Sequence, residues 1–204
     1  MEQRTEEWFA AKLGKASASH VSDILAKTKS GYSATRKNYM MKLLCERLKG
    51  KRQEDTYVSR DMERGTEREP LARSAYEAKT GVMVEEVGFI DHPTIPMFGA
   101  SPDGLVGEDG CIEIKCPLTA QHVDLLTGGN IDTKYIYQMQ TQMACTGRKW
   151  CDFVDYDSDL IEELSLFIRR IPRDEAMIGM IEEAVIQFNA ELDALIEQLQ
   201  GLTA

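Results

Sequence analysis

The chain has 204 residues, of which 43% are apolar, and it carries a formal net charge of −10. This composition suits one hydrophobic core, and no Ser/Gly/Pro-rich linker interrupts the chain, so we expect a single domain over residues 1–204. No apolar run approaches the eighteen or so residues of a membrane span, and the N-terminal segment MEQRTEEWFA lacks the apolar stretch of a signal peptide. The five cysteines are odd in number and scattered, which indicates a reducing, cytoplasmic location. Because no membrane span is predicted, we expect no membrane association.

The net charge is unevenly distributed. Residues 1–52 carry twelve Lys/Arg and five Asp/Glu, a balance of +7, whereas residues 53–204 carry twelve and twenty-nine, a balance of −17. Individual lysines usually only solubilise helices, but the block as a whole favours an anionic partner for the N-terminal segment.

Apolar periodicity, caps and breakers predict an α/β order along the chain. A short helix capped by Thr5 should end at Gly14, and Ser17 or Ser19 should open the next helix, which runs to Leu25. Further helices are expected at 34–49, 60–79, 119–127, 131–145 and 174–200. Strands are expected at 82–90, 150–156 and 164–171, with a hairpin over 98–115.

The most informative stretch is Ser101-Pro102-Asp103, followed after nine residues by Glu113-Ile114-Lys115. The segment between them is rich in turn residues, and residues 111–115 alternate like a strand. A period of two places Cys111, Glu113 and Lys115 on one face of that strand. Because Asp103 begins the turn, a hairpin brings its carboxylate back beside Glu113.

Two carboxylates and an ammonium on one patch form a cation site for Mg²⁺, and a phosphodiester cut by metal-activated water is the natural substrate. The plain alternative is an exposed hairpin with a surface Glu–Lys pair. The strand ends in Cys116-Pro117 between apolar runs, which favours a central strand. The cysteine spacings are looser than those of zinc ribbons, so structural zinc is not expected.

These residues carry a resemblance to a known family. The chain resembles the YqaJ-like phage recombination exonucleases of the PD-(D/E)xK superfamily, of the kind represented by bacteriophage lambda exonuclease. The resemblance rests on Ala100–Leu105 with Glu113–Pro117, on Lys12-Leu13-Gly14 with Ala18-Ser19, on Gly65 with Glu69, and on Tyr137–Gln140. It implies a restriction-endonuclease-like core, with a central mixed β-sheet flanked by helices.

The resemblance also implies roles for the catalytic residues. Asp103 would bridge two Mg²⁺ ions, for which Mn²⁺ could substitute, and Glu113 with the Ile114 carbonyl would complete one metal site. Lys115 would orient or deprotonate the attacking water. Glu69 would add a carboxylate to the metals or the water, and Gln138 would bond near the nucleophile. On the residues alone, Glu69 could equally be a solvated helix charge and Gln138 a polar surface residue.

A pocket for a 5′-phosphate is implied at the N-terminal segment. Ser19 fits a phosphate-binding hydroxyl at a helix N-terminus, although a simple N-cap accounts for it as well. Ser17 and Lys15 lie beside it as further candidates for DNA contact. Lys12 stands where the relative compared has arginine; lysine neutralises a phosphate but cannot form the bidentate fork.

Three functions compete. The leading one is an Mg²⁺-dependent 5′–3′ exonuclease on double-stranded DNA ends, which leaves 3′ overhangs for single-strand annealing in phage-type recombination. A restriction or repair endonuclease of the same superfamily is the second, and a non-catalytic DNA-binding protein the third. The resemblance implies a phage or prophage origin in a bacterial host and a partner annealing protein. It also implies a homo-oligomeric ring around DNA, a trimer or else a tetramer.

Overall fold

The computed structural model describes residues 2–29, 31–52 and 60–202, and side-chain burial is described from residue 63 onward in the last of these ranges. Helices and strands are interspersed along the chain, in the α/β order that the sequence predicts. None of the helices in these ranges is long and apolar enough to cross a membrane.

A five-stranded mixed sheet forms the centre of the molecule, with strand order β10-β9-β8-β7-β4. The strands are Leu166–Pro172 (β10), Trp150–Tyr156 (β9), Gly110–Lys115 (β8), Gly104–Val106 (β7) and Val84–Glu85 (β4). The β8–β9 pair is parallel, and the other three pairs are antiparallel. β8 is therefore the middle strand, which confirms that Glu113-Ile114-Lys115 lies on a central strand.

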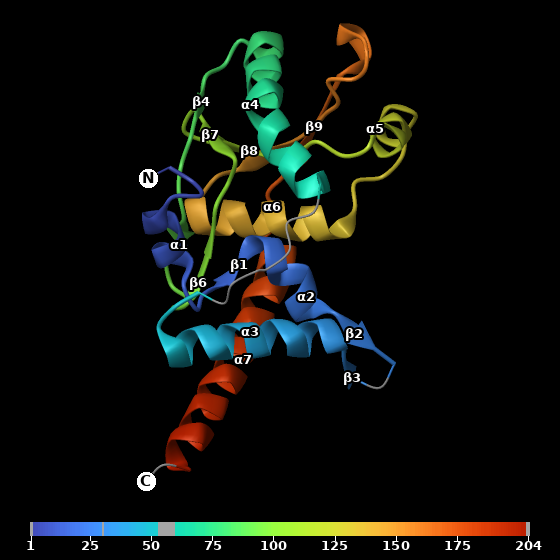
Figure 1. The fold of residues 1–204 in the computed structure, drawn as a ribbon. Helices are drawn as coiled ribbons and strands as arrows, with labels where there is room; N and C mark the ends of the chain where they lie inside the picture. The colour runs from blue at the N-terminus through green and yellow to red at the C-terminus, as the bar shows by residue number, and fades with distance from the viewer. Residues whose placement is uncertain (1, 30, 53–59, 203–204) are drawn as a thin grey trace.

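Two helices cover the two faces of this sheet (Figure 1). Arg60–Thr80 (α4) packs Ala72 and Tyr76 against Ile112 and Ile114 on one face. Thr133–Thr146 (α6) packs Met139 and Met143 against the opposite face. Both faces of β8 are thus buried, and the predicted alternation holds: the isoleucines face α4, whereas Cys111 faces α6.

A second core lies beyond α6 and is built by the N-terminal segment and the last helix. Ala16–Ser17 (β1), Phe98–Ala100 (β6) and Ile90–Asp91 (β5) form a three-stranded sheet. Packed near it are Glu6–Lys12 (α1), the 3₁₀ turn Ala18–His20 (η1), Val21–Leu25 (α2), Ala34–Lys49 (α3) and Glu175–Gly201 (α7). The apolar stripe of α7 is buried here, against α2 and α3. Its helical spacing therefore serves the core.

The smaller elements lie at the periphery. A hairpin of Lys27–Thr28 (β2) and Gly31–Tyr32 (β3) projects beyond α3 (Figure 1). Thr119–Leu126 (α5) follows β8, and the 3₁₀ turn Glu162–Leu164 (η2) precedes β10.

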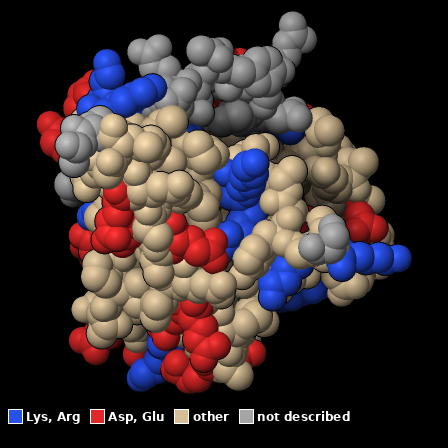
Figure 2. Space-filling model, turned by 90° about the horizontal axis from the view of Figure 1, so that it is seen from below, with Lys and Arg blue, Asp and Glu red and all other residues tan. Residues whose placement is uncertain are grey.

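Part of the positive charge of the N-terminal segment is neutralised within the fold. Arg36 and Arg47 of α3 pair with Glu191 at 2.7 Å and Asp193 at 2.8 Å on α7. On the face seen from below, Lys and Arg side chains lie at the centre, at the right and at the upper left, and Asp and Glu side chains lie mainly along the left and lower edges (Figure 2). The block of positive charge read from the sequence is therefore only partly available to an external anion.

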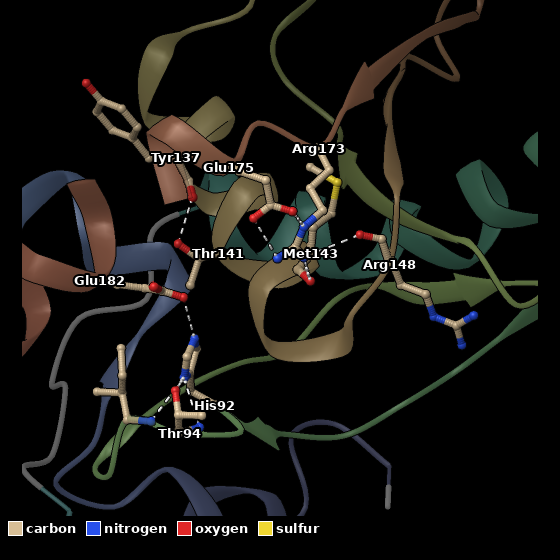
Figure 3. Close-up of polar contacts among 10 residues, drawn as sticks. His92, Thr94, Tyr137, Thr141, Met143, Arg148, Arg173, Glu175 and Glu182 are labelled. Carbon is tan, nitrogen blue, oxygen red and sulfur yellow. Dashed lines mark hydrogen bonds and ion pairs between the residues drawn. The ribbon is translucent and has the colours of Figure 1, made fainter. Parts of the chain in front are cut away.

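Polar contacts fix the start of α7 and the loop before β6 (Figure 3). Arg173 donates to the Met143 carbonyl at 2.5 Å and pairs with Glu175, which joins the entrance of α7 to the end of α6. Nε2 of His92 lies 3.1 Å from Glu182, and its Nδ1 accepts from the amides of Thr94 and Ile95. Because Nδ1 is an acceptor, Nε2 carries the hydrogen and donates to the carboxylate.

Three expectations about the elements need correction. The strand expected at 82–90 is two short strands in different sheets, because the Val87 carbonyl accepts from Gln3 instead of a neighbouring strand. The hairpin expected at 98–115 comprises only 104–115, since β6 pairs with β1 and β5. Neither Ser17 nor Ser19 caps a helix through its side chain; Ser17 is the N-cap residue of η1 by position only.

Candidate active site

Asp103 is placed by the turn between β6 and β7. Its amide donates to the Ile112 carbonyl at 3.2 Å, and its Oδ2 accepts from the Ile114 amide at 2.7 Å. The carboxylate is therefore held against β8 at the position from which the Glu113 and Lys115 side chains emerge. The hairpin predicted from the sequence brings the two carboxylates together.

Glu113 is 1% exposed and lies on the face of β8 that meets α6. Oε1 accepts from Gln138 Nε2 at 2.7 Å, and Oε2 accepts from Gln142 Nε2 at 2.5 Å. The Lys115 ammonium forms an ion pair with the same carboxylate. A buried charge is stable only when it is paired and hydrogen-bonded, and here three donors meet that need.

The charges of this cluster act on one another. Burial raises the pKa of Asp103 well above its usual value, and the neighbouring Glu113 carboxylate raises it further. Burial alone would lower the pKa of Lys115, but Glu113 and Asp103 outweigh it, so the net shift is upward. Lys115 is therefore an ammonium at neutral pH, and its positive charge lowers the pKa of Asp103 by less than burial and Glu113 raise it.

Glu69 reaches the same region from α4. Its carboxylate pairs with Arg4 at 2.6 Å and with Arg73 at 3.0 Å, and its charge contributes to the raised pKa of Asp103. Arg73 also donates to the Asp103 carbonyl at 3.4 Å. Glu69 thus faces the cluster and is not a solvated helix charge.

An open cavity of about 590 Å³ joins these groups to the N-terminal segment. Its lining includes all of the expected catalytic residues and three of the four expected DNA-contacting residues: Asp103, Glu113, Ile114, Lys115, Glu69, Gln138, Lys12, Ser17 and Ser19. Residues that are more than ninety positions apart in the sequence therefore face one space. Its size and polar lining suit a segment of a nucleic-acid strand.

Lys12, Ser17 and Ser19 line the same cavity. The Lys12 ammonium lies 4.0 Å from the centroid of the Trp8 ring, and the hydroxyls of Ser17 and Ser19 are 3.3 Å apart. Burial lowers the pKa of Lys12 to about 8, and the positive charges of Lys42 and Arg52 contribute.

Lys15 is the expected site residue that lies elsewhere. It lines a second cavity of about 300 Å³, and its ammonium pairs with Asp91 at 2.6 Å. The positive charge of Lys15 is therefore neutralised within the protein. Lys12 lines both cavities.

Three residues of the site were not singled out from the sequence. Gln142 lies one helical turn after Gln138 and Arg73 one turn after Glu69, so i, i+4 spacing could have indicated both. The Trp8 indole N–H donates to the Ser101 hydroxyl at 2.9 Å, a contact across ninety-three positions that no local pattern announces.

The donor set fits a hard divalent cation. The described residues contain no cluster of three or more His, Cys, Asp or Glu side chains able to hold a metal ion. Mg²⁺, however, keeps several waters and is usually bound through one or two carboxylates. Asp103, with its raised pKa, and Glu113 provide two such carboxylates at an open cavity. A cation there would relieve the repulsion between them.

The fold and the site together define a class of protein. Residues 7–149 match the model of the YqaJ-like viral recombinase domain, and the chain belongs to that family. Membership supports a nuclease role in recombination. The mixed sheet between α4 and α6 is the restriction-endonuclease-like core expected from the sequence.

Solved structures agree with this assignment. The chain is 54% identical to an alkaline exonuclease, LHK-Exo, from Laribacter hongkongensis, with 98% of each chain covered and a TM-score of 0.90. For LHK-Exo in complex with dAMP the identity is 53%, the coverage again 98% of each chain, and the TM-score 0.91. A phage-related exonuclease from Haemophilus somnus 129PT shares the fold, at 19% identity and a TM-score of 0.69 over 91% of this chain and 96% of that one. No curated protein sequence matches the chain.

Proposed function

We propose that the protein is an Mg²⁺-dependent deoxyribonuclease that degrades one strand of double-stranded DNA from its 5′ end, leaving 3′ single-stranded overhangs. The observation that carries the proposal is the convergence of Asp103, Glu113 and Lys115 on one cavity that Lys12, Ser17 and Ser19 also line. Carboxylates and an ammonium suit phosphodiester hydrolysis, and a cation with hydroxyls suits a terminal phosphate. The likeness to an alkaline exonuclease over 98% of the chain supports the reaction class.

The residues of the cluster divide the work of hydrolysis. Asp103, Glu113 and the Ile114 carbonyl would hold Mg²⁺, with Mn²⁺ as a substitute, and a bound pair of metal ions would stabilise the attacking and leaving oxygens. Lys115 orients the attacking water with its ammonium and offsets negative charge that develops on the phosphate. Gln138 and Gln142 keep the Glu113 carboxylate in one orientation, and Glu69 adds negative charge beside Asp103.

The 5′ end is the part of the substrate that Lys12 would recognise. The Lys12 ammonium lies in the same cavity as Asp103, so a terminal phosphate there would direct the next phosphodiester towards the carboxylates. The 3′-terminated strand then remains, and a single-strand annealing protein is the partner that would use it. We propose that the protein acts in the cytoplasm of a bacterial host and that a phage or prophage gene encodes it.

The experiment offers the protein linear and closed-circular duplex DNA, with and without Mg²⁺. We expect the protein to digest the linear DNA but not the closed circles, and to do so only when Mg²⁺ is present. The products should be 5′-mononucleotides. Cutting of closed circles would identify an endonuclease instead. Binding of DNA without any cleavage in Mg²⁺ or Mn²⁺ would indicate a non-catalytic DNA-binding protein.

A closed ring of three chains is the assembly that we propose for processive digestion. The acidic remainder of the chain repels DNA, so topological enclosure, and not tight binding, would keep the enzyme on its substrate. The basic N-terminal segment would help to line the channel, apart from the arginines that α7 already neutralises.

A further inference from the structure

The helix α5 forms one wall of the catalytic cavity. It starts four residues after Lys115, and the cavity is lined by Leu118, just before the helix, and by Gln121 within it. Two of its eight residues, His122 and Leu125, are buried, and the rest of the helix is largely in solvent. So short and exposed a helix has little apolar packing to fix its position, so the polar contacts of its buried histidine matter more.

His122 is 0% exposed, and both of its ring nitrogens face acceptors. Nδ1 lies 2.5 Å from Oδ1 of Asp155, and Nε2 lies 2.7 Å from the Leu164 carbonyl oxygen. A carbonyl cannot donate, so Nε2 carries a hydrogen. A second hydrogen lies between Nδ1 and the carboxyl, and the pair is neutral overall whichever atom holds it.

Asp155 connects this pair to the catalytic strand. It lies in β9, is 2% exposed, and is the register partner of Lys115 in the parallel β8–β9 pair. Burial raises the pKa of Asp155 to about 6, against the opposing effect of its hydrogen bond with His122. The chain thus leaves β8 at Lys115, turns through α5, and is tied back by His122 to the strand beside its starting point.

A neighbouring contact ties a second element to the end of β9. Asp157, one residue after β9, has a buried carboxylate whose Oδ1 accepts from the Asp159 amide at 3.0 Å. It also pairs with Arg68 of α4 at 3.0 Å, one residue before Glu69. The end of β9 therefore anchors two of the elements that line the cavity.

We propose that the His122–Asp155 pair is a positioning device, which holds the α5 wall so that a DNA strand in the cavity lies in register with Asp103 and Glu113. The inference rests on the proposed nuclease function. Neither residue lines the cavity, so the pair acts through Leu118 and Gln121 and does not touch the reacting atoms. Displacement of such a wall by about 1 Å is enough to lower turnover by up to about a hundredfold.

The test compares two variants. One removes the hydrogen bonds of His122, and the other keeps these hydrogen bonds but replaces the Asp155 carboxylate with a neutral amide. His122→Phe fills the volume but leaves Asp155 and the Leu164 carbonyl unpaired. In Asp155→Asn, the new amide can donate to Nδ1 while Nε2–H still donates to Leu164, so the geometry is retained. We expect kcat on linear duplex to fall at least tenfold in His122→Phe and to stay within about threefold of wild type in Asp155→Asn. Amide hydrogen exchange over residues 119–126 should accelerate only in the first variant.

The outcomes separate this inference from the proposed function. A wild-type protein that does not digest DNA defeats the proposed function, yet hydrogen exchange still reports on the anchoring of α5. A folded His122→Phe variant with wild-type kcat, or an Asp155→Asn variant as impaired as His122→Phe, overturns the inference. If His122→Phe does not fold, Asp155→Ala is compared with Asp155→Asn instead. Both variants are assayed well below their melting temperatures.

Discussion

At the scale of single residues, Asp103 and Lys115 are two members of the charge cluster that each have a defined polar partner. Asp103 is fixed by the Ile114 amide at 2.7 Å, and Lys115 by its ion pair with Glu113. Both side chains face the cavity and neither is part of a hydrophobic cluster, so their replacement should leave the fold intact.

Asp103→Asn or Lys115→Ala should lower the rate of DNA digestion by more than about a hundredfold, the scale of losing one electrostatic group at the reacting centre. Initial rates on linear duplex in Mg²⁺ measure this. Asp109→Asn is the matched control, because Asp109 lies in the β7–β8 turn and pairs with Lys149 at the surface. Near wild-type rates in both cluster variants would remove this site from consideration.

Lys12 leads to a prediction about pH. Its lowered pKa, about 8, means that the ammonium loses its proton as pH rises through that value, whereas a terminal phosphate stays dianionic above pH 7. The preference in kcat/KM for 5′-phosphorylated over 5′-hydroxyl duplex should therefore decline between pH 7 and pH 9.

Lys12→Arg should abolish that decline, because a guanidinium stays charged throughout this range. Lys12→Ala should remove the preference at every pH, and Lys149→Ala, at an exposed ammonium outside the cavity, should not change it. Equal effects of Lys12→Ala on the two substrates would show that Lys12 does not contact the terminal phosphate.

At the scale of elements, the small sheet β1-β6-β5 connects Ser17, which lines the cavity, to the turn that carries Asp103. β1 ends at Ser17 and β6 ends three residues before Asp103, and the two strands pair in parallel. Close packing in this sheet therefore sets the distance between Ser17 and that turn.

Gly99 is the position where that packing is tightest. A Cβ there would lie 2.5 Å from the Ile90 carbonyl oxygen, which belongs to the backbone and cannot rotate away. Gly99→Ala should lower the free energy of unfolding by about 1–3 kcal/mol, the usual cost of overpacking, and thermal unfolding should show a melting temperature several degrees lower.

Gly179→Ala on α7 is the matched control, since nothing lies within 4 Å of a Cβ at that position. Alanine is favoured over glycine in a helix by about 0.5–1 kcal/mol, so this variant should unfold at an equal or higher temperature. A Gly99→Ala protein as stable as the wild type would show that β5 and β6 separate more easily than their packing indicates.

At the scale of the whole molecule, charge and assembly are linked. The +7 of residues 1–52 and the −17 of the remainder make the molecule electrostatically asymmetric, and α7 neutralises part of the positive side. Enclosure of DNA by several copies would compensate for the net electrostatic repulsion between DNA and a chain of charge −10.

Light scattering at micromolar concentration should report a mass of about three chains. The same preparation should digest long linear duplex processively. An unlabelled DNA trap added after the start should therefore have little effect on digestion of the duplex that is already bound. A monomer that remains processive in the presence of the trap would contradict the ring, and a mass of four chains would replace the trimer by the tetramer.

The local part of the site could be predicted from the sequence for a physical reason. Asp103, Glu113 and Lys115 lie within thirteen positions of one another, and a hairpin with a period of two brings them together without help from the rest of the chain. Helix positions followed from apolar periodicity, and the central place of β8 followed from the apolar runs on both sides of it.

Tertiary structure alone decided the remainder. Glu69 and Gln138 come from helices on opposite faces of the sheet, and whether each points to the cluster depends on how α4 and α6 dock. The split of the expected 82–90 strand followed from a bond between Gln3 and the Val87 carbonyl, eighty-four positions apart. The commitment of Lys15 to Asp91 and the burial of the His122–Asp155 pair are likewise contacts between distant segments. Short-range periodicity determines which face a side chain occupies, but only packing of the whole chain determines what that face meets.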